Sequence, residues 1–340
     1  MRFKKRYGQH FLKFVPNSFK RLVKGFTLLQ NHALILIETG PGGGILTYYV
    51  LDILKNKVQS FLKNNNINNI DNTNKTTNRY IVPRIFYRAV EVDKDLTFSI
   101  KSNELIDFQV IYNDILQVSI SDLILQIIQQ NNLWTSDKIN VFLFGALPYN
   151  ISKKIVLKQA YEFCLLNQEL NSLCSGNDKK SVKYNVYNNF NISSLDGTFW
   201  YMLQKEVADS FLAVPPNATF ISNSLRLYTK DLQLGEVLPS NKFYPKPKVE
   251  SASIFGKYNK PVNSAKCHNC GQRQKIINFM HKFFIYRRKT IRKILRILRV
   301  KNIDKVINHL KGHLYILNKR PQELQIKDWQ TLYDIIKGYR

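Results

Sequence analysis

Residues 33–44, with the sequence ALILIETGPGGG, carry the strongest indication of the fold. The apolar run at 33–38 is typical of a buried strand, and the glycine-rich turn after it leads into a helical pattern at about 46–62. Because Gly40, Gly42 and Gly44 have no side chains, a ligand can approach the backbone closely at this turn. Taken alone, the pattern also fits an ordinary glycine and proline turn.

The sequence downstream of this turn alternates strands with helices. We expect further strands at 85–92, 108–112 and 141–144, with a helix at about 123–130. This alternation predicts an α/β fold with a parallel sheet and right-handed crossovers. Beyond Tyr258 only helical patterns occur, at about 274–299, 303–309 and 326–336.

The change of pattern predicts two domains. The α/β domain covers residues 1–258 and includes two polar, Asn-rich insertions at about 63–79 and 168–197. A small, basic, all-helical domain covers residues 259–340. Because polar low-complexity segments bury too little apolar surface to form a core, we expect both insertions to be disordered surface segments.

The charge distribution favours a polyanionic partner. The chain has 51 Lys and Arg against 24 Asp and Glu, a net charge of +27, and residues 1–37 and 251–303 contain no acid. Blocks of one sign predict a surface that contacts nucleic-acid phosphates. The expected RNA contacts lie on one face of the helix at 274–299: Arg287, Arg288, Lys289, Arg292, Lys293 and Arg296. The less favoured alternative is a membrane-surface helix, because Ile291, Ile294, Leu295 and Leu298 form an apolar stripe there.

Other classes of protein fit the sequence poorly. No apolar run reaches the roughly 18 residues that a membrane span needs. Four cysteines fit a reducing compartment. Cys267 and Cys270 form a single CxxC pair, and a zinc site would need two further ligands, for which Cys164 and Cys174 are the candidates. We prefer free thiols on a surface loop and expect no metal.

Acidic residues follow two of the predicted strands. Glu91 ends the second strand, where a carboxylate accepts both hydroxyls of a ribose, and Asp114 ends the third, where it accepts from an adenine amine. The glycine turn lacks the last glycine of the dinucleotide fingerprint, and no phosphate-binding lysine motif is present. The pattern therefore favours S-adenosylmethionine over a dinucleotide.

Seven motifs in order extend this interpretation: GQHFL at 8–12, ETGPG at 38–42, EVD at 91–93, LPYNIS at 147–152, MLQKEV at 202–207, FYPKPKVES at 243–251 and RRKTIR at 287–292. Together they resemble the ribosomal RNA adenine dimethyltransferase family, in its bacterial and organellar branch. The resemblance covers nearly the whole chain outside the two insertions.

The resemblance implies a Rossmann-like class I S-adenosylmethionine-dependent methyltransferase domain followed by a helical domain. The implied cofactor contacts are Gln9, His10, Leu12, Gly40, Gly42, Gly44, Glu91, Asp114 and Ala146. The implied contacts to the target adenine are Ala146, Leu147, Pro148, Tyr149 and Phe243, with the Tyr149 ring stacking on the base. The implied activity is dimethylation of adenine N6 near the 3′ end of small-subunit ribosomal RNA during assembly of the small ribosomal subunit, by a protein that is monomeric apart from the ribosome.

This chain departs from the family pattern at Ala146, where the family has an asparagine whose side-chain carbonyl accepts from the target amine. Only a backbone carbonyl remains, and losing one transition-state contact costs ~10²–10³-fold in rate. Lys246 also stands where a proline is usual. The sequence leaves open a weakened or inactive member that acts as an rRNA-binding assembly factor, a ribosome-bound component or an organellar transcription factor.

The sequence also leaves more than one cellular compartment open. The Asn-rich insertions suggest an AT-rich eukaryotic genome, and with the bacterial-like motifs they favour an organelle, a mitochondrion more than a plastid. A bacterial cytoplasm is the alternative. The basic, acid-free start of the chain also fits a targeting presequence, but it is poor in serine and contains the GQHFL motif.

Overall fold

The computed structural model describes residues 10–65, 83–96, 106–133, 138–174, 195–259, 269–300 and 303–338, without the side chains of 171–174. The chain divides into two compact units, the α/β unit (residues 1–208 and 230–261) and the helical unit (209–229 and 262–340). Segment 209–229 belongs to the helical unit, although the predicted boundary at residue 258 would assign it to the α/β domain. Its helix α6 (Phe220–Arg226) contacts α7 (Cys270–Phe284), a pairing between segments far apart in the chain.

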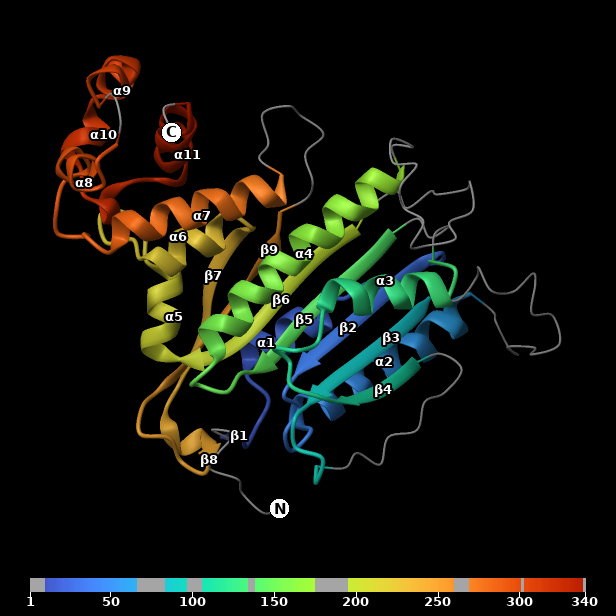
Figure 1. The fold of residues 1–340 in the computed structure, drawn as a ribbon. Helices are drawn as coiled ribbons and strands as arrows, with labels where there is room; N and C mark the ends of the chain where they lie inside the picture. Colours follow the sequence, from blue (N-terminus) through green and yellow to red (C-terminus); the bar gives the residue numbers. More distant parts are fainter. Residues whose placement is uncertain are drawn as a thin grey trace. The chain divides into compact units, whose positions relative to one another are not determined.

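A seven-stranded sheet forms the centre of the α/β unit (Figure 1). Its strand order is β4-β3-β2-β5-β6-β9-β7. The first five strands run parallel, and β9 runs antiparallel to β6. The bounds are β2 (His32–Thr39), β3 (Arg84–Glu91), β4 (Ile106–Tyr112), β5 (Lys138–Ala146), β6 (Leu195–Gln204), β7 (Thr229–Leu238) and β9 (Ser251–Tyr258).

The order of the strands reverses beside β2. From β2 the chain continues to β3 and β4 on one side, and then crosses to β5 and β6 on the other. Such a switch point opens a crevice beyond the carboxyl ends of the strands, where ligands bind in open α/β sheets. The glycine turn after β2 and the segment after β5 both lie at this crevice.

Helices cover both faces of the sheet, which explains why β2 is apolar without alternation. Leu34 and Leu36 belong to a core that includes α1 (Asn17–Lys24) and α2 (Ile45–Asn64). The intervening Ile35 and Ile37 are fully buried and point to the other face, which α3 (Ile120–Gln130) and α4 (Ser152–Cys174) cover in Figure 1.

Two segments far apart in the chain form a short ribbon. β1 (Phe11–Leu12) pairs antiparallel with β8 (Phe243–Tyr244), so that Phe11 lies opposite Tyr244 and Leu12 opposite Phe243. Figure 1 shows this ribbon beyond the end of the sheet toward which the parallel strands point. No local pattern in the sequence predicted this pairing, nor the strands β6, β7 and β9.

The helical unit corrects one expectation. The single helix predicted at 274–299 is wrong: α7 ends at Phe284 and α8 (Ile291–Ile297) begins after a turn. Thr290 has an extended backbone, and the Ile291 amide donates to the Lys319 carbonyl, 2.8 Å away. The break lets the predicted apolar stripe of α8 enter a core with Phe283 and Trp329.

The remaining helices are short. They are α5 (Lys205–Leu212), α9 (Ile303–His309), α10 (Tyr315–Asn318), α11 (Ile326–Lys337) and the 3₁₀ helices η4 (Ser240–Lys242), η5 (Lys311–His313) and η6 (Pro321–Glu323). The helices predicted at 303–309 and 326–336 correspond to α9 and α11. No helix within the described part of the chain is both long enough and apolar enough to cross a membrane.

Candidate functional site

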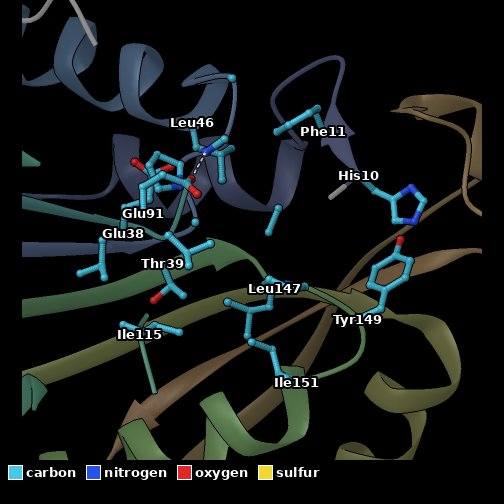
Figure 2. A pocket seen from close by; sticks show the side chains of 18 of the residues that line it. His10, Phe11, Glu38, Thr39, Leu46, Glu91, Ile115, Leu147, Tyr149 and Ile151 are labelled. Carbon is cyan, nitrogen blue, oxygen red and sulfur yellow. Dashed lines mark hydrogen bonds between the residues drawn. The ribbon is translucent and has the colours of Figure 1, made fainter. Parts of the chain in front are cut away.

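A cavity of about 300 Å³ lies at the carboxyl ends of β2, β3, β4 and β5 (Figure 2). Five short segments of the α/β unit line it: 10–12, 38–46 without Gly44, 90–92, 113–116 and 146–151. In Figure 2, Glu38 and Glu91 lie at one end, and His10 and Tyr149 at the other. The cavity thus brings the glycine turn, the two acidic strand ends and the LPYN segment to one place.

The glycine turn after β2 has a backbone shape that lets other groups approach it closely. Gly42 has φ 55°, in the left-handed region, and a Cβ built on it would lie 2.7 Å from Phe11 Cδ1. Any other residue here would therefore strain the backbone and displace the Phe11 ring. Gly40 and Gly42 line the cavity, whereas Gly44 precedes α2 as its N-cap residue and does not.

Glu91 is buried at the end of β3, and both of its oxygens accept from backbone amides. Oε2 accepts from Gly42 N at 3.1 Å and Oε1 from Asp93 N at 2.9 Å. These bonds link β3 to the glycine turn and orient the carboxylate in the cavity wall. Because a carboxylate oxygen can accept more than one hydrogen bond, the group can still accept from a ribose hydroxyl. Burial raises the pKa of Glu91.

Asp114 follows β4 in the same wall. Its Oδ1 accepts from Leu116 N at 2.9 Å, which holds the carboxylate at the start of the turn, and the cavity lining includes Ile115, a buried apolar side chain. No described residue engages Oδ2, so an amine of a bound ligand has an acceptor there. An apolar side chain next to an acceptor suits a flat heterocycle with an exocyclic amine.

Glu38 belongs to the ETGPG motif, and the sequence predicts no role for it. Its carboxylate is 1% exposed and accepts from Thr47 Oγ1 at 2.6 Å and from the Tyr87 hydroxyl. Burial raises the pKa of Glu38 to about 7, and the nearby Glu91 adds to the rise. A single acid at the end of an otherwise apolar strand was the available signal.

The other end of the cavity is built from the segment after β5. Ala146 is half-buried, and Leu147 N donates to Met202 O at 3.0 Å, which continues the pairing of β5 with β6. A Cβ on Gly145 would lie 2.2 Å from the Thr39 carbonyl oxygen, so β5 approaches β2 closely just before Ala146. The Ala146 side chain ends in a methyl group and offers no acceptor.

Tyr149 contacts two other segments at this end. Its hydroxyl lies 2.5 Å from Ser251 Oγ, and its ring stacks with His10. His10 Nδ1 lies 2.7 Å from the Pro245 carbonyl oxygen, so in the neutral ring Nδ1 carries the proton. Burial raises the pKa of Tyr149, which therefore stays protonated near neutral pH.

Several predicted site residues lie elsewhere. Phe243 is 1% exposed, belongs to the core, and is not among the residues that line the cavity, because its pairing in β8 turns it inward. Gln9 falls outside the described residues. The basic residues 287–289 lie exposed in the turn between α7 and α8, not on a helix face as expected, while Arg292, Lys293 and Arg296 are on α8.

The described residues contain no cluster of His, Cys, Asp and Glu that could hold a metal ion. Cys270 is buried at the first position of α7, which corrects the expectation of a surface loop at that residue, and Cys267 lies outside the described residues.

Comparisons with known proteins identify relatives of this chain. Residues 86–337 match the family model described as ribosomal RNA adenine dimethylase. The chain is 26% identical to a ribosomal RNA small subunit methyltransferase A of Sulfurihydrogenibium sp., covering 98% of this chain and 96% of that protein. A protein of the same name from Cytophaga hutchinsonii is also 26% identical, with 98% and 97% covered. The fold is similar to a crystal structure of a dimethyladenosine transferase from Plasmodium falciparum, at TM-score 0.57 and 15% identity, covering 97% and 98% of the two chains.

Proposed function

This chain belongs to the ribosomal RNA adenine dimethylase family, and from that premise we propose that it dimethylates adenine N6 in the RNA of the small ribosomal subunit. It is an S-adenosylmethionine-dependent rRNA methyltransferase with a Rossmann-like catalytic domain and a helical C-terminal domain. The observation that carries the proposal is the single cavity lined by the glycine turn, Glu91, Asp114 and the Ala146–Tyr149 segment.

The residues present fit the cofactor. Glu91 would accept from the ribose hydroxyls, Asp114 from the adenine amine, and the turn at Gly40 and Gly42 would allow the methionine part to approach the backbone. Bound S-adenosylmethionine supplies an electrophilic methyl group on a sulfonium sulfur. His10 and Leu12 also line the cavity, and the His10 ring lies beside Tyr149 at its other end.

The chain's own contribution to the reaction is positioning and electrostatics. The Tyr149 ring, which lines the cavity, would stack on a base that has left its helix. Backbone carbonyl groups of the 146–148 segment would accept from the target amine, which favours a pyramidal nitrogen with an available lone pair.

The net charge of +27 and the exposed basic residues of 287–296 support binding to rRNA within an immature small subunit. We propose that the protein takes part in assembly of that subunit and is monomeric apart from it. The Asn-rich insertions support a mitochondrial location.

The test is methyl transfer from labelled S-adenosylmethionine to under-methylated small subunits. We expect labelled dimethyladenine with the wild-type chain, and more with Ala146→Asn. The absence of label from the wild type, together with intact cofactor binding and activity of Ala146→Asn, would reject catalysis and favour an rRNA-binding assembly factor.

A further inference from the structure

Strand β8 presents an exposed aromatic ring. Tyr244 is 63% exposed, whereas its neighbour Phe243 is buried. An aromatic ring of this size in water leaves much apolar surface uncovered, which often marks a binding surface when polar groups surround it.

Three contacts place the segment that contains Tyr244 beside the cavity, although Tyr244 is not among the residues that line it. Tyr244 lies directly opposite Phe11, which lines the cavity, and opposed residues of an antiparallel pair share one face of the ribbon. The next residue, Pro245, accepts a hydrogen bond from His10, whose ring stacks with Tyr149. At the far end of the same segment, Ser251 contacts the Tyr149 hydroxyl. The 244–251 segment therefore borders the place proposed for the target base.

The charge around this ring is positive. Lys242, Lys246 and Lys248 are exposed, and Glu250 is the only acid between 240 and 251. No described residue forms an ion pair with Lys246 or Lys248. An exposed ring with free ammonium groups beside it has the composition of a single-stranded nucleic-acid platform, in which bases stack and phosphates meet cations.

We propose that Tyr244 stacks on the base of the nucleotide next to the target adenine, and that Lys246 and Lys248 contact the adjoining phosphates. This rests on the proposed function for the identity of the neighbouring nucleotide. The partner is single-stranded RNA, because a base is free to stack on Tyr244 only where it is unpaired. The lysines add affinity that falls with salt.

The proposed RNA platform, which consists of Tyr244, Lys246 and Lys248, can be tested by RNA binding alone, without methyl transfer. The full chain is titrated into a short single-stranded RNA that carries 2-aminopurine next to an adenine. Stacking on Tyr244 quenches the fluorescence, and we expect Tyr244→Ala to lose the quench and to weaken binding roughly 10-fold. Tyr244→Phe keeps an aromatic ring and should stay within about twofold of the wild type. Tyr48→Ala, which removes an exposed ring of α2, is the matched control.

The lysines give a second readout. Lys246→Ala should reduce the slope of log affinity against log salt by about 0.7, the value for one phosphate contact on a single strand. Equal affinities of Tyr244→Ala and Tyr48→Ala for RNA would overturn the proposal. Loss of binding to whole small subunits by Tyr244→Ala, with unchanged binding to free RNA, would overturn it too and would identify a protein partner.

Methyl transfer measured in parallel separates this inference from the proposed function. With an active wild type, Tyr244→Ala should raise KM for the RNA and change kcat little. An active wild type whose RNA binding does not depend on Tyr244 overturns the platform alone. An inactive wild type whose quench does depend on Tyr244 overturns the proposed reaction and leaves the platform in place.

Discussion

The imidazole of His10 stacks on the ring of Tyr149, with ring centroids 5.2 Å apart and planes inclined by 26°. His10 is held in this position by its hydrogen bond to the Pro245 carbonyl. His10, just before β1, and Pro245, just after β8, thus form a contact beside Tyr149, the residue proposed to stack on the target base.

We expect His10→Ala to weaken cofactor binding about 2- to 10-fold, the range for one net hydrogen bond, because residues 10–12 lose their tie to Pro245. Isothermal titration with S-adenosylhomocysteine measures the effect. His313→Ala, an exposed histidine of the helical unit, is the control. Unchanged affinity in His10→Ala would contradict a role for this contact in closing the cavity.

Ala146→Asn should raise the rate of methyl transfer, because a side-chain carbonyl at the end of β5 would add an acceptor for the target amine. We expect an increase in kcat of about 10-fold or more, with little change in cofactor affinity. Ala146→Leu, which adds volume without an acceptor, is the matched control. An increase in kcat in both variants would mean that added side-chain volume, and not a hydrogen-bond acceptor, speeds the reaction.

Glu91→Gln should weaken cofactor binding by about 10- to 100-fold, because hydrogen bonds to a charged acceptor are stronger than those to an amide. The Gln side chain still accepts from Gly42 N, so the turn should keep its shape. Calorimetric titration against Asp52→Asn, a change on α2, measures the effect. A chain that melts at a lower temperature but binds normally would assign Glu91 a structural role only.

Glu38 should make the stability of the fold depend on pH. Burial raises its pKa from 4.5 to about 7, so the folded chain binds more protons than the unfolded chain between these values. The stabilising effect of the neutral carboxyl is therefore full below about pH 4.5 and is lost as pH rises through about 7, a change of about 3 kcal/mol. Urea unfolding at several pH values checks this. Glu38→Gln, which keeps an acceptor for Thr47 and Tyr87, should flatten that part of the profile.

The turn between α7 and α8 should contribute to RNA affinity. Arg287→Ala together with Arg288→Ala removes two exposed charges and should reduce the salt slope of rRNA binding by about 1.4 to 1.8. Lys327→Ala, an exposed charge on α11, is the comparison. An equal reduction per charge in the comparison would mean that binding follows net charge and not this turn.

Much of the site was predictable because its signals are local. Each segment carries its own signal. The strand before Gly40 is a continuous apolar run, and the next two strands are followed by the acids Glu91 and Asp114. Parallel strands then place their carboxyl ends at one edge of the sheet, so the residues come together without further information. The two-part division and the family resemblance followed from such patterns too.

Only the tertiary structure decided the rest, because it depends on contacts between distant segments. The pairing of β1 with β8 turned Phe243 into the core and exposed Tyr244. The pKa of Glu38 depends on burial among residues of α2 and β3, which the strand itself does not encode. The turn at 285–290 formed where the carbonyl of Lys319 offered a partner to Ile291, although the helical period continues through it. Local periodicity determined which elements form, whereas packing determined where they end and what their side chains meet.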